Sequence, residues 1–168
     1  MRVLIDSDRV QARVRELGAQ ISRDYEGKDL AVVGILKGSF VFMADLIRQI
    51  TVPVTCDFLR CSSYGDAKVS SGQVRLDLDT TQPMTGKHVL LVEDIIDTGL
   101  TMSYLLDNFR TRKPETLKVC ALLHKPDRAK VQVPIDYLGF TIPDAFVVGY
   151  GLDHAGKFRN LNHIAVVE

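Results

Sequence analysis

Three carboxylates fall within five residues, at Glu93, Asp94 and Asp97, around the end of the apolar segment 88–94, which is predicted to be a buried strand. The segment 98–101, Thr-Gly-Leu-Thr, follows them and leads into a predicted helix. In α/β sheets, ligands collect at the carboxyl ends of strands, and the free N–H groups at a helix start attract anions. Carboxylate oxygens suit sugar hydroxyls and Mg²⁺. The pattern therefore predicts a site for a phosphorylated sugar together with Mg²⁺.

These residues also have a plainer interpretation, because acids are common at strand ends and at helix starts. Glu93 and Asp94 would then be solvated side chains, and Asp97 would only cap the helix predicted over 97–113. Gly99 and the threonines near it favour the phosphate site. Glycine lets the backbone approach an anion, and the hydroxyl groups donate hydrogen bonds.

Other nucleotide-binding and hydrolase motifs are broken or missing. In 34–38 the lysine precedes the second glycine, whereas a P-loop places it after that glycine. Gly149 and Gly151 begin a dinucleotide motif, but His154 stands where its third glycine belongs. Neither HExxH nor GxSxG occurs. A dehydrogenase, a P-loop kinase, a zinc protease and an esterase are therefore disfavoured.

The elements that must position this turn follow from the periodicity of apolar residues. Steps of 3–4 residues indicate helices, and continuous apolar runs indicate strands that are buried on both faces. The predicted helices are 8–25, 39–50 with Ser39 as its N-cap, and 97–113. The predicted strands are 30–36, 54–64, 74–78, 88–94, 117–123, 136–141, 145–150 and 163–167, and the segment 62–72 is expected to be a mobile loop. The alternation predicts one α/β domain with a mostly parallel sheet and helices on both faces.

Composition limits the class of protein. The 168 residues, 46% hydrophobic and 25% charged, suit one soluble domain with its own core. Lys and Arg together number 21, as do Asp and Glu, so the positive charge expected of a nucleic-acid binder is missing. The first residues do not resemble a secretory signal, and no apolar run reaches the roughly 18 residues of a membrane helix. We expect a cytoplasmic protein with neither nucleic acid nor membrane as its partner.

The three cysteines offer neither a metal site nor a nucleophile. Cys56, Cys61 and Cys120 sit in or beside apolar runs and show no CxxC or zinc-site spacing. They are expected to be reduced thiols in the core.

The segment 89–101, VLLVEDIIDTGLT, resembles the phosphoribosyl-pyrophosphate (PRPP) signature of type I phosphoribosyltransferases, in the form found in the hypoxanthine-guanine phosphoribosyltransferase family. Three more segments match that family in order, so the resemblance covers nearly the whole chain. They are 34–46, 62–76 and the tail from Lys125 through 142–167. One signature would leave the base open, whereas four matching segments indicate a 6-oxopurine.

The resemblance implies one phosphoribosyltransferase domain over 1–168. Its parts would be a core at about 25–140, a small hood made of about 1–8 and 142–168, and a flexible lid loop at 62–76. Ser63 and Tyr64 of the lid would close over the reaction centre and exclude water, and the loop would stay open without ligands. Because relatives are usually dimers or tetramers, a homodimer or homotetramer is expected.

The reaction that the resemblance implies is displacement of pyrophosphate from C1 of PRPP by N9 of hypoxanthine or guanine, with Mg²⁺ as cofactor. Asp97 would be the general base at purine N7. Glu93 and Asp94 would hold the ribose hydroxyls and Mg²⁺, and backbone N–H groups would hold the 5′-phosphate. The implied PRPP-binding set is Glu93, Asp94, Asp97, Thr98, Gly99, Leu100 and Thr101. Leu100 departs from the basic or amide residue common at that position.

Pyrophosphate would be held by Lys37 and Gly38, which match the family's pyrophosphate loop, and by Arg159. In this loop the peptide bond between Leu36 and Lys37 is expected to be cis. The metal set implied by the resemblance is Glu93, Asp94 and Asp153, with Asp153 on a second Mg²⁺.

The implied purine-binding set is Lys125, Phe146, Val147 and Asp153. Lys125 would donate to the 6-oxo group, so adenine, which carries an amino group there, should react poorly. Phe146 would stack on the base, and Val147 would present backbone groups to its edge. Gly151 and His154 depart from the family pattern beside Asp153 and leave the fit to the purine 2-position open.

Two alternatives remain open at this stage. A xanthine-preferring relative would use the same site with another oxopurine. Some proteins of this fold instead bind PRPP and regulate transcription, which the even charge and the presence of Asp97, Lys125, Asp153 and Arg159 disfavour.

Overall fold

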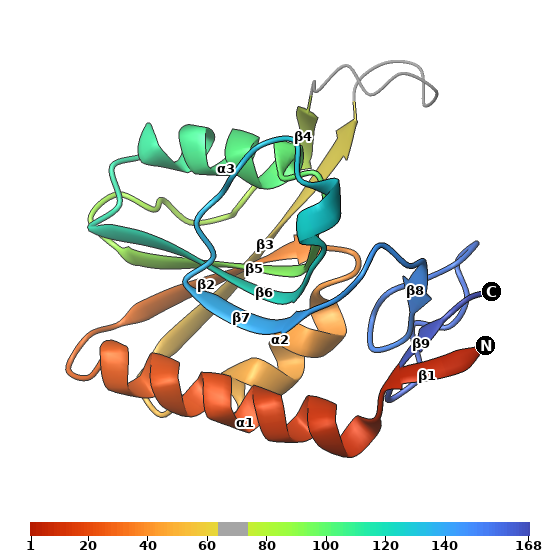
Figure 1. Cartoon of the computed structure of the whole chain (residues 1–168). Coiled ribbons are helices and arrows are strands. Elements are labelled where there is room, and N and C mark those ends of the chain that lie inside the picture. Colours follow the sequence, from red (N-terminus) through yellow and green to blue (C-terminus); the bar gives the residue numbers. More distant parts are fainter. Residues whose placement is uncertain (64–73) are drawn as a thin grey trace.

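A six-stranded sheet forms the centre of the computed structural model, which describes residues 1–63 and 74–168 (Figure 1). The strand order is β4-β3-β2-β5-β6-β7, and all neighbours are parallel except β4, which runs antiparallel to β3. The strands are β2 (Leu30–Leu36), β3 (Val54–Ser63), β4 (Val74–Leu78), β5 (His88–Ile96), β6 (Thr116–His124) and β7 (Tyr137–Thr141). The predicted mostly parallel α/β sheet is confirmed.

Helices cover both faces of this sheet. They are α1 (Ser7–Asp24), α2 (Phe40–Ile47) and α3 (Leu100–Arg110), with a short 3₁₀ turn, η1, at Pro126–Arg128. α1 and α2 lie on one face and α3 on the other (Figure 1). Neighbouring residues of β2 point to opposite faces, so Val32 packs in the core under α1 and α2, and Val33 packs in the core under α3. Both are fully buried, which explains why this strand is continuously apolar. Within the described residues, no helix has the length and apolarity needed to cross a membrane.

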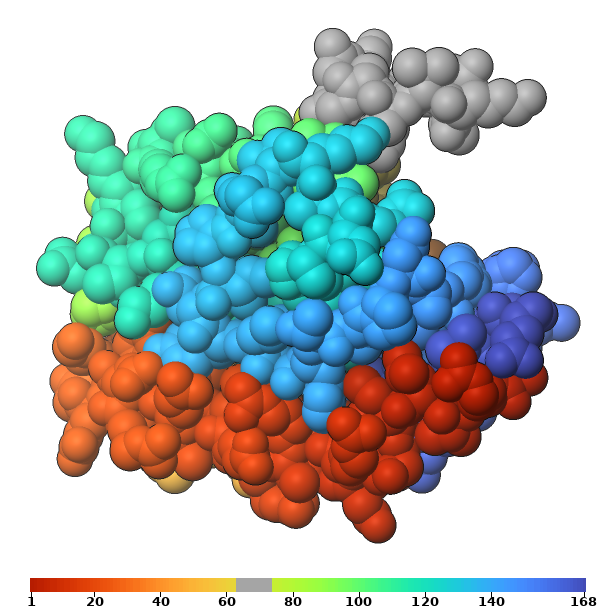
Figure 2. Space-filling view, in the orientation of Figure 1, coloured from red at the N-terminus to blue at the C-terminus, as the bar shows by residue number. Residues whose placement is uncertain are grey.

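Both ends of the chain build the hood. β1 (Arg2–Ile5), β9 (Ile164–Val166) and β8 (Val147–Val148) form a small antiparallel sheet in the order β1-β9-β8. The two termini therefore lie side by side at one end of the molecule (Figure 1), and Figure 2 shows their red and dark-blue atoms in contact. The sequence did not predict β1 as a strand, because four residues are too few for a clear alternation.

Several predicted boundaries differ from the structure at the ends of elements. α2 ends at Ile47 rather than residue 50, since the backbone of Gln49 and Ile50 continues in i→i+3 turns. β5 continues two residues beyond the predicted end, to Ile96, whereas β3 covers Val54–Ser63 of the strand predicted over 54–64. Ser39 occupies the N-cap position of α2, but its buried hydroxyl makes no capping bond.

The prediction of three core thiols is wrong for two cysteines. Cys120 is buried, whereas Cys56 is exposed and Cys61 is partly buried, and all three are free thiols. Cys56 is exposed because β4 pairs with β3 only between Arg60 and Ser63, which leaves the earlier part of β3 uncovered along its outer side. Cys61 is paired with Leu76 but lines an open hollow, so it is only partly buried.

Asp6 is the N-cap of α1, directly after β1 of the hood, and its capping bond can be tested by mutation. Its Oδ1 accepts a hydrogen bond of 2.9 Å from the backbone N–H of Arg9. Asp6→Ala is expected to lower the free energy of unfolding by about 1 kcal/mol, measured by urea denaturation. Asp8→Ala removes an acid from the same first turn without removing a capping bond and should cost less. Equal losses for the two variants would contradict the capping role.

Candidate active site

The carboxylates at the end of β5 lie at very different depths. Glu93 is 8% exposed, and its Oε1 accepts a bond of 3.1 Å from the backbone N–H of Asp94. Asp94 is partly buried, and its Oδ1 accepts a bond of 2.8 Å from the N–H of Ile95. Burial, and then the neighbouring charge of Asp94, raise the pKa of Glu93 well above its ordinary value. Nearby positive charge would relieve this cost, so the pair favours a cation.

Gly99, not Asp97, is the N-cap of α3. Gly99 has a φ of +86°, and a Cβ atom there would lie 2.4 Å from the carbonyl oxygen of Val131. The same connection is held by the carbonyl of Thr98, which accepts bonds of 2.9 and 3.1 Å from the N–H groups of Lys130 and Val131. The plainer interpretation of Asp97 as a helix cap is therefore wrong, and its carboxylate is left for other partners.

A hollow of about 140 Å³ opens directly over this turn. Its lining includes Glu93, Asp94, Asp97, Thr98, Gly99 and Thr101. Leu100 does not line it, and its N–H donates a long bond of 3.4 Å to Oγ1 of Thr98. The residue that departs from the family pattern is thus not among those that line the predicted phosphate site.

The loop between β2 and α2 packs against the acidic turn. A Cβ atom at Gly38 would lie 1.8 Å from Oδ2 of Asp94, so this carboxylate rests on the loop backbone. Lys37 is exposed, and the peptide bond between Leu36 and Lys37 is cis, as the resemblance predicts.

The third wall comes from the hood, through the hairpin 149–161. Arg159 lies 3.2 Å from Oδ1 of Asp153 and donates a bond of 2.6 Å to the carbonyl of Gly151. A Cβ atom at Gly151, which has a φ of +101°, would lie 2.3 Å from the carbonyl oxygen of Gly38. The glycine at 151 thus accommodates the contact between the hood and the loop.

These three walls surround a hollow of about 280 Å³. It shares Glu93, Asp94 and Thr101 with the lining of the first hollow. It brings together seven residues that the sequence analysis singled out: Lys37 and Gly38 from the loop, Glu93, Asp94 and Thr101 from β5 and α3, and Asp153 and Arg159 from the hood. Its lining contains both acidic and basic side chains. Such a lining suits a polyanion accompanied by a divalent cation.

Of the residues predicted to bind the purine, Asp153 lines the larger hollow, whereas Lys125, Phe146 and Val147 line neither hollow. Lys125 is 7% exposed, its N–H donates to the carbonyl of Ile96 at 3.0 Å, and its ammonium has no hydrogen-bond or ion-pair partner among the described residues. Phe146 is 51% exposed and meets the ring of His154 edge-on, with the ring centroids 5.3 Å apart. Val147 is buried and pairs with β9.

Only residues 62–63 and 74–76 of the predicted lid loop lie within the described residues. Ser63 is the last residue of β3, whereas Tyr64 and the segment 64–73 lie outside the described residues. The expected open lid is therefore still a prediction.

Asp97 has a partner that the sequence did not predict. Nε of Arg128, in η1, donates a bond of 2.8 Å to Oδ1 of Asp97, and its Nη1 lies 3.8 Å from Asp144. The missed residues also include Cys61 and Ser62, which line the larger hollow. Burial raises the pKa of the Cys61 thiol to about 11, so it stays protonated and unreactive. No motif marks these residues, because their place depends on strand order and on loop packing.

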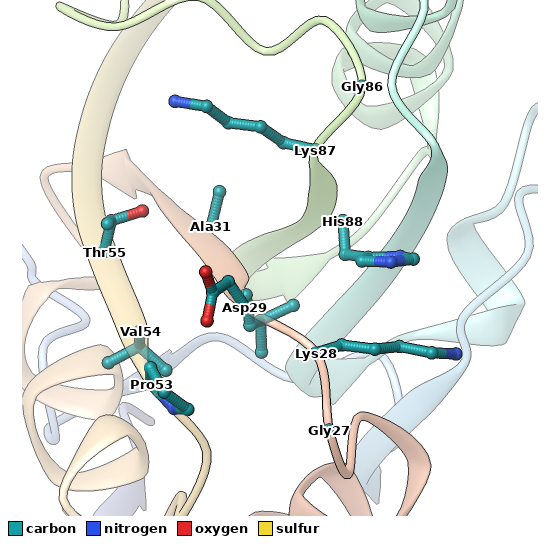
Figure 3. Close-up of a pocket in the computed structure, with 11 residues that line it drawn as sticks. Gly27, Lys28, Asp29, Ala31, Pro53, Val54, Thr55, Gly86, Lys87 and His88 are labelled. Carbon is teal, nitrogen blue, oxygen red and sulfur yellow. The ribbon is translucent and has the colours of Figure 1, made fainter.

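A third hollow, of about 510 Å³, lies at the opposite ends of β2, β3 and β5 (Figure 3). It is lined by none of the predicted site residues. Figure 3 shows Lys28 and Lys87 extending in opposite directions, so its cations do not converge on one point.

Mg²⁺ fits the donor set at the end of β5. Mg²⁺ binds through one or two carboxylates and completes its shell with water and substrate phosphate oxygens. Glu93 and Asp94 supply such carboxylates, and the buried charge of Glu93 is one that a cation would stabilise. Among the described residues, no group of three or more side chains could hold a metal without a substrate.

Comparison with known proteins agrees with this geometry. Residues 5–155 match the phosphoribosyl transferase domain family. The chain is 50% identical over 168 residues to a hypoxanthine phosphoribosyltransferase of Haemophilus influenzae, covering 98% of this chain and 94% of that protein. It is 46% identical over 167 residues to a hypoxanthine-guanine phosphoribosyltransferase of Bacillus subtilis, covering 99% and 93%.

The chain belongs to the phosphoribosyltransferase family. A crystal structure of a hypoxanthine-guanine phosphoribosyltransferase from Bacillus anthracis superimposes with a TM-score of 0.96 at 51% identity, covering 100% of this chain and 99% of that one. The sheet and the hood are thus those of a type I phosphoribosyltransferase.

The raised pKa of Glu93 predicts how stability depends on pH without metal. Between the ordinary value of 4.5 and the raised value, the folded protein holds a proton that the unfolded chain has released. Stability is therefore lost as the pH rises through this window, and Glu93→Gln removes the loss. In buffer with a chelator, Glu93→Gln should be more stable than the natural protein at pH 8, and this advantage should shrink towards pH 5. Urea denaturation at both pH values measures it.

Glu16→Gln is the control, because the side chain of Glu16 is 64% exposed on α1. Its effect should be small at both pH values. An advantage of Glu93→Gln that stays constant with pH would show that the carboxylate is ionised in the folded protein.

Proposed function

We propose that this phosphoribosyltransferase acts in purine salvage, moving the 5-phosphoribosyl group of PRPP to N9 of hypoxanthine and guanine and forming IMP or GMP with pyrophosphate. One observation carries the proposal. The acidic turn of β5 faces the loop Lys37–Gly38 and the hood pair Asp153 and Arg159 across one hollow, in a chain about half identical to proteins that bear this activity in their names.

PRPP would lie along the two hollows. Its 5′-phosphate would sit at the start of α3, where backbone N–H groups of 97–101 and the hydroxyls of Thr98 and Thr101 are at hand. Its pyrophosphate would lie between Lys37 and Arg159. One Mg²⁺ held by Glu93 and Asp94 on the ribose side, and a second held by Asp153, would supply positive charge for the departing pyrophosphate.

Proton transfer would fall to Asp97. As N9 attacks C1, positive charge spreads over the ribose ring and N7 loses its proton. The carboxylate of Asp97 would accept that proton. Because Oδ1 already accepts from Arg128, Oδ2 is the oxygen that remains for the base.

Selection of the base would fall to Lys125 and Phe146. Lys125 is only 7% exposed, and its ammonium has no partner among the described residues, so the 6-oxo group would supply an acceptor for its hydrogen bonds. The exposed ring of Phe146 offers a stacking surface for a purine. Closure by Ser63 and Tyr64, assembly into a homodimer or homotetramer, and location in the cytoplasm belong to the same proposal.

Comparing four bases tests this function. With PRPP and Mg²⁺, hypoxanthine and guanine should be converted to nucleotides, whereas adenine should react at least roughly 100-fold more slowly, because it offers Lys125 an amino group instead of an acceptor. Release of pyrophosphate and nucleotide measures the rates. Faster turnover of xanthine than of the other oxopurines would favour a xanthine-preferring enzyme, and PRPP binding without turnover of any base would favour a regulator.

Replacement of Asp97 tests the proton transfer. Asp97→Ala should lower kcat by roughly 10²–10⁴-fold, the usual contribution of a general base, and change the Kd of PRPP far less. Asp107→Ala, on the exposed side of α3, is the control and should leave both unchanged. If Asp97→Ala weakened PRPP binding but kept kcat, Asp97 would be a binding residue and not the base.

A further inference from the structure

A side-chain hydrogen bond joins the two outer walls of the larger hollow. One wall is the loop Lys37–Gly38 at the start of α2, and the other is the hairpin 149–161, which carries Asp153 and Arg159. These segments lie more than 100 residues apart in the sequence. Their separation in space must nevertheless be constant if both are to contact the same pyrophosphate.

Tyr150 makes this contact. It is 2% exposed, has a φ of +50°, and lies at the base of the hairpin between two glycines of φ +101°. Its hydroxyl donates to Oδ2 of Asp45, on the second turn of α2. Asp45 also accepts from Nη2 of Arg48 at 2.5 Å and from Nε2 of Gln11 at 3.4 Å, so its carboxylate is held from three sides.

Backbone hydrogen bonds connect Tyr150 to the part of the hairpin that carries Asp153 and Arg159. The N–H of Tyr150 donates to the backbone carbonyl of Leu161 at 2.8 Å, and the N–H of Gly151 donates to the backbone carbonyl of Arg159 at 3.0 Å. The carbonyl of Gly151 in turn accepts from the guanidinium of Arg159, which pairs with Asp153. A shift of Tyr150 would therefore move both charged side chains.

The phenol can keep this role over the whole working range of pH. Burial, and then the hydrogen bond and charge of Asp45, raise the pKa of Tyr150 far above its ordinary value. The hydroxyl therefore stays a donor.

We infer that Tyr150 and Asp45 form a clamp that sets the spacing between the loop Lys37–Gly38 and the hood pair Asp153 and Arg159. Tyr150 is thus a positioning residue for the pyrophosphate end of the reaction, an inference that rests on the proposed function. Neither residue of the clamp lines the phosphate hollow at the start of α3. Loss of the clamp should therefore weaken the binding of pyrophosphate and PRPP far more than that of IMP, which has no pyrophosphate.

Hydrogen exchange of backbone amides tests the clamp itself. Tyr150→Phe should speed exchange in 150–161 several-fold in the protein without ligands. Tyr137→Phe is the matched control, because Tyr137 is equally buried and its hydroxyl donates a bond of 2.6 Å to Asp24, far from the hood. It should leave exchange in the hairpin unchanged. Unchanged exchange in Tyr150→Phe would overturn the clamp.

Calorimetry tests its consequence, with pyrophosphate, PRPP and IMP as titrants in magnesium buffer. Tyr150→Phe should weaken pyrophosphate and PRPP roughly ten-fold, the effect of one hydrogen bond to a charged group, with less than a two-fold change for IMP. Asp45→Ala should reproduce this pattern, and Asp45→Asn, which keeps a carbonyl acceptor, should restore most of the affinity. Equal weakening of all three titrants would overturn the positioning role, because it would indicate a general loss of structure.

Failure of the proposed function would look different. If the natural protein converted no purine with PRPP, that function would fall, whereas the exchange measurement would still decide whether the clamp exists. If Tyr150→Phe did not fold, the comparison of Asp45→Ala with Asp45→Asn would decide it by the same two measurements.

Discussion

Close packing of backbone at Gly38 is the constraint on which the rest of the site depends. A carboxylate oxygen of Asp94 approaches it on one side, and the backbone of Gly151 approaches its carbonyl on the other. Neither contact leaves room for a Cβ atom. The sheet, the loop before α2 and the hood can therefore meet only at glycine, and this meeting brings cationic and acidic side chains within reach of one polyanion.

The sheet supports this contact because its buried strands hold the end of β5 in place. The charged side chains of the site would not keep this arrangement by themselves. The central strands of the sheet are buried on both faces by apolar side chains, so the end of β5 is fixed in position. That end carries a buried carboxylate beside a second one, an arrangement that disfavours folding in the absence of a cation. The apolar layers thus stabilise a constellation of charges that would not be stable alone, as is common at sites that bind charged substrates.

The sequence predicted the central elements well because their signals are local. The limits of β2 follow directly from one apolar run, and α1 follows from its periodic stripe. The residues around the larger hollow were found through the family's motifs, each of which is contiguous. Contacts between distant segments were not predictable: Tyr150 and Asp45 are 105 residues apart, and Arg128 and Asp97 are 31 apart. The exposure of Cys56 was missed for a similar reason, because it depends on how far β4 extends along β3. Pairing and register of this kind depend on the tertiary fold, which periodicity does not contain.

The pairing of β1 with β9 has a consequence for how the protein is made. The sheet strands and α3 can form as soon as they leave the ribosome, but β1 must wait, unpaired, until residues 164–166 emerge. Until then Asp153 and Arg159 have no finished hood to hold them. The nascent chain therefore becomes competent to hold pyrophosphate only after residues 164–166 have been synthesised, later than the strands of the central sheet.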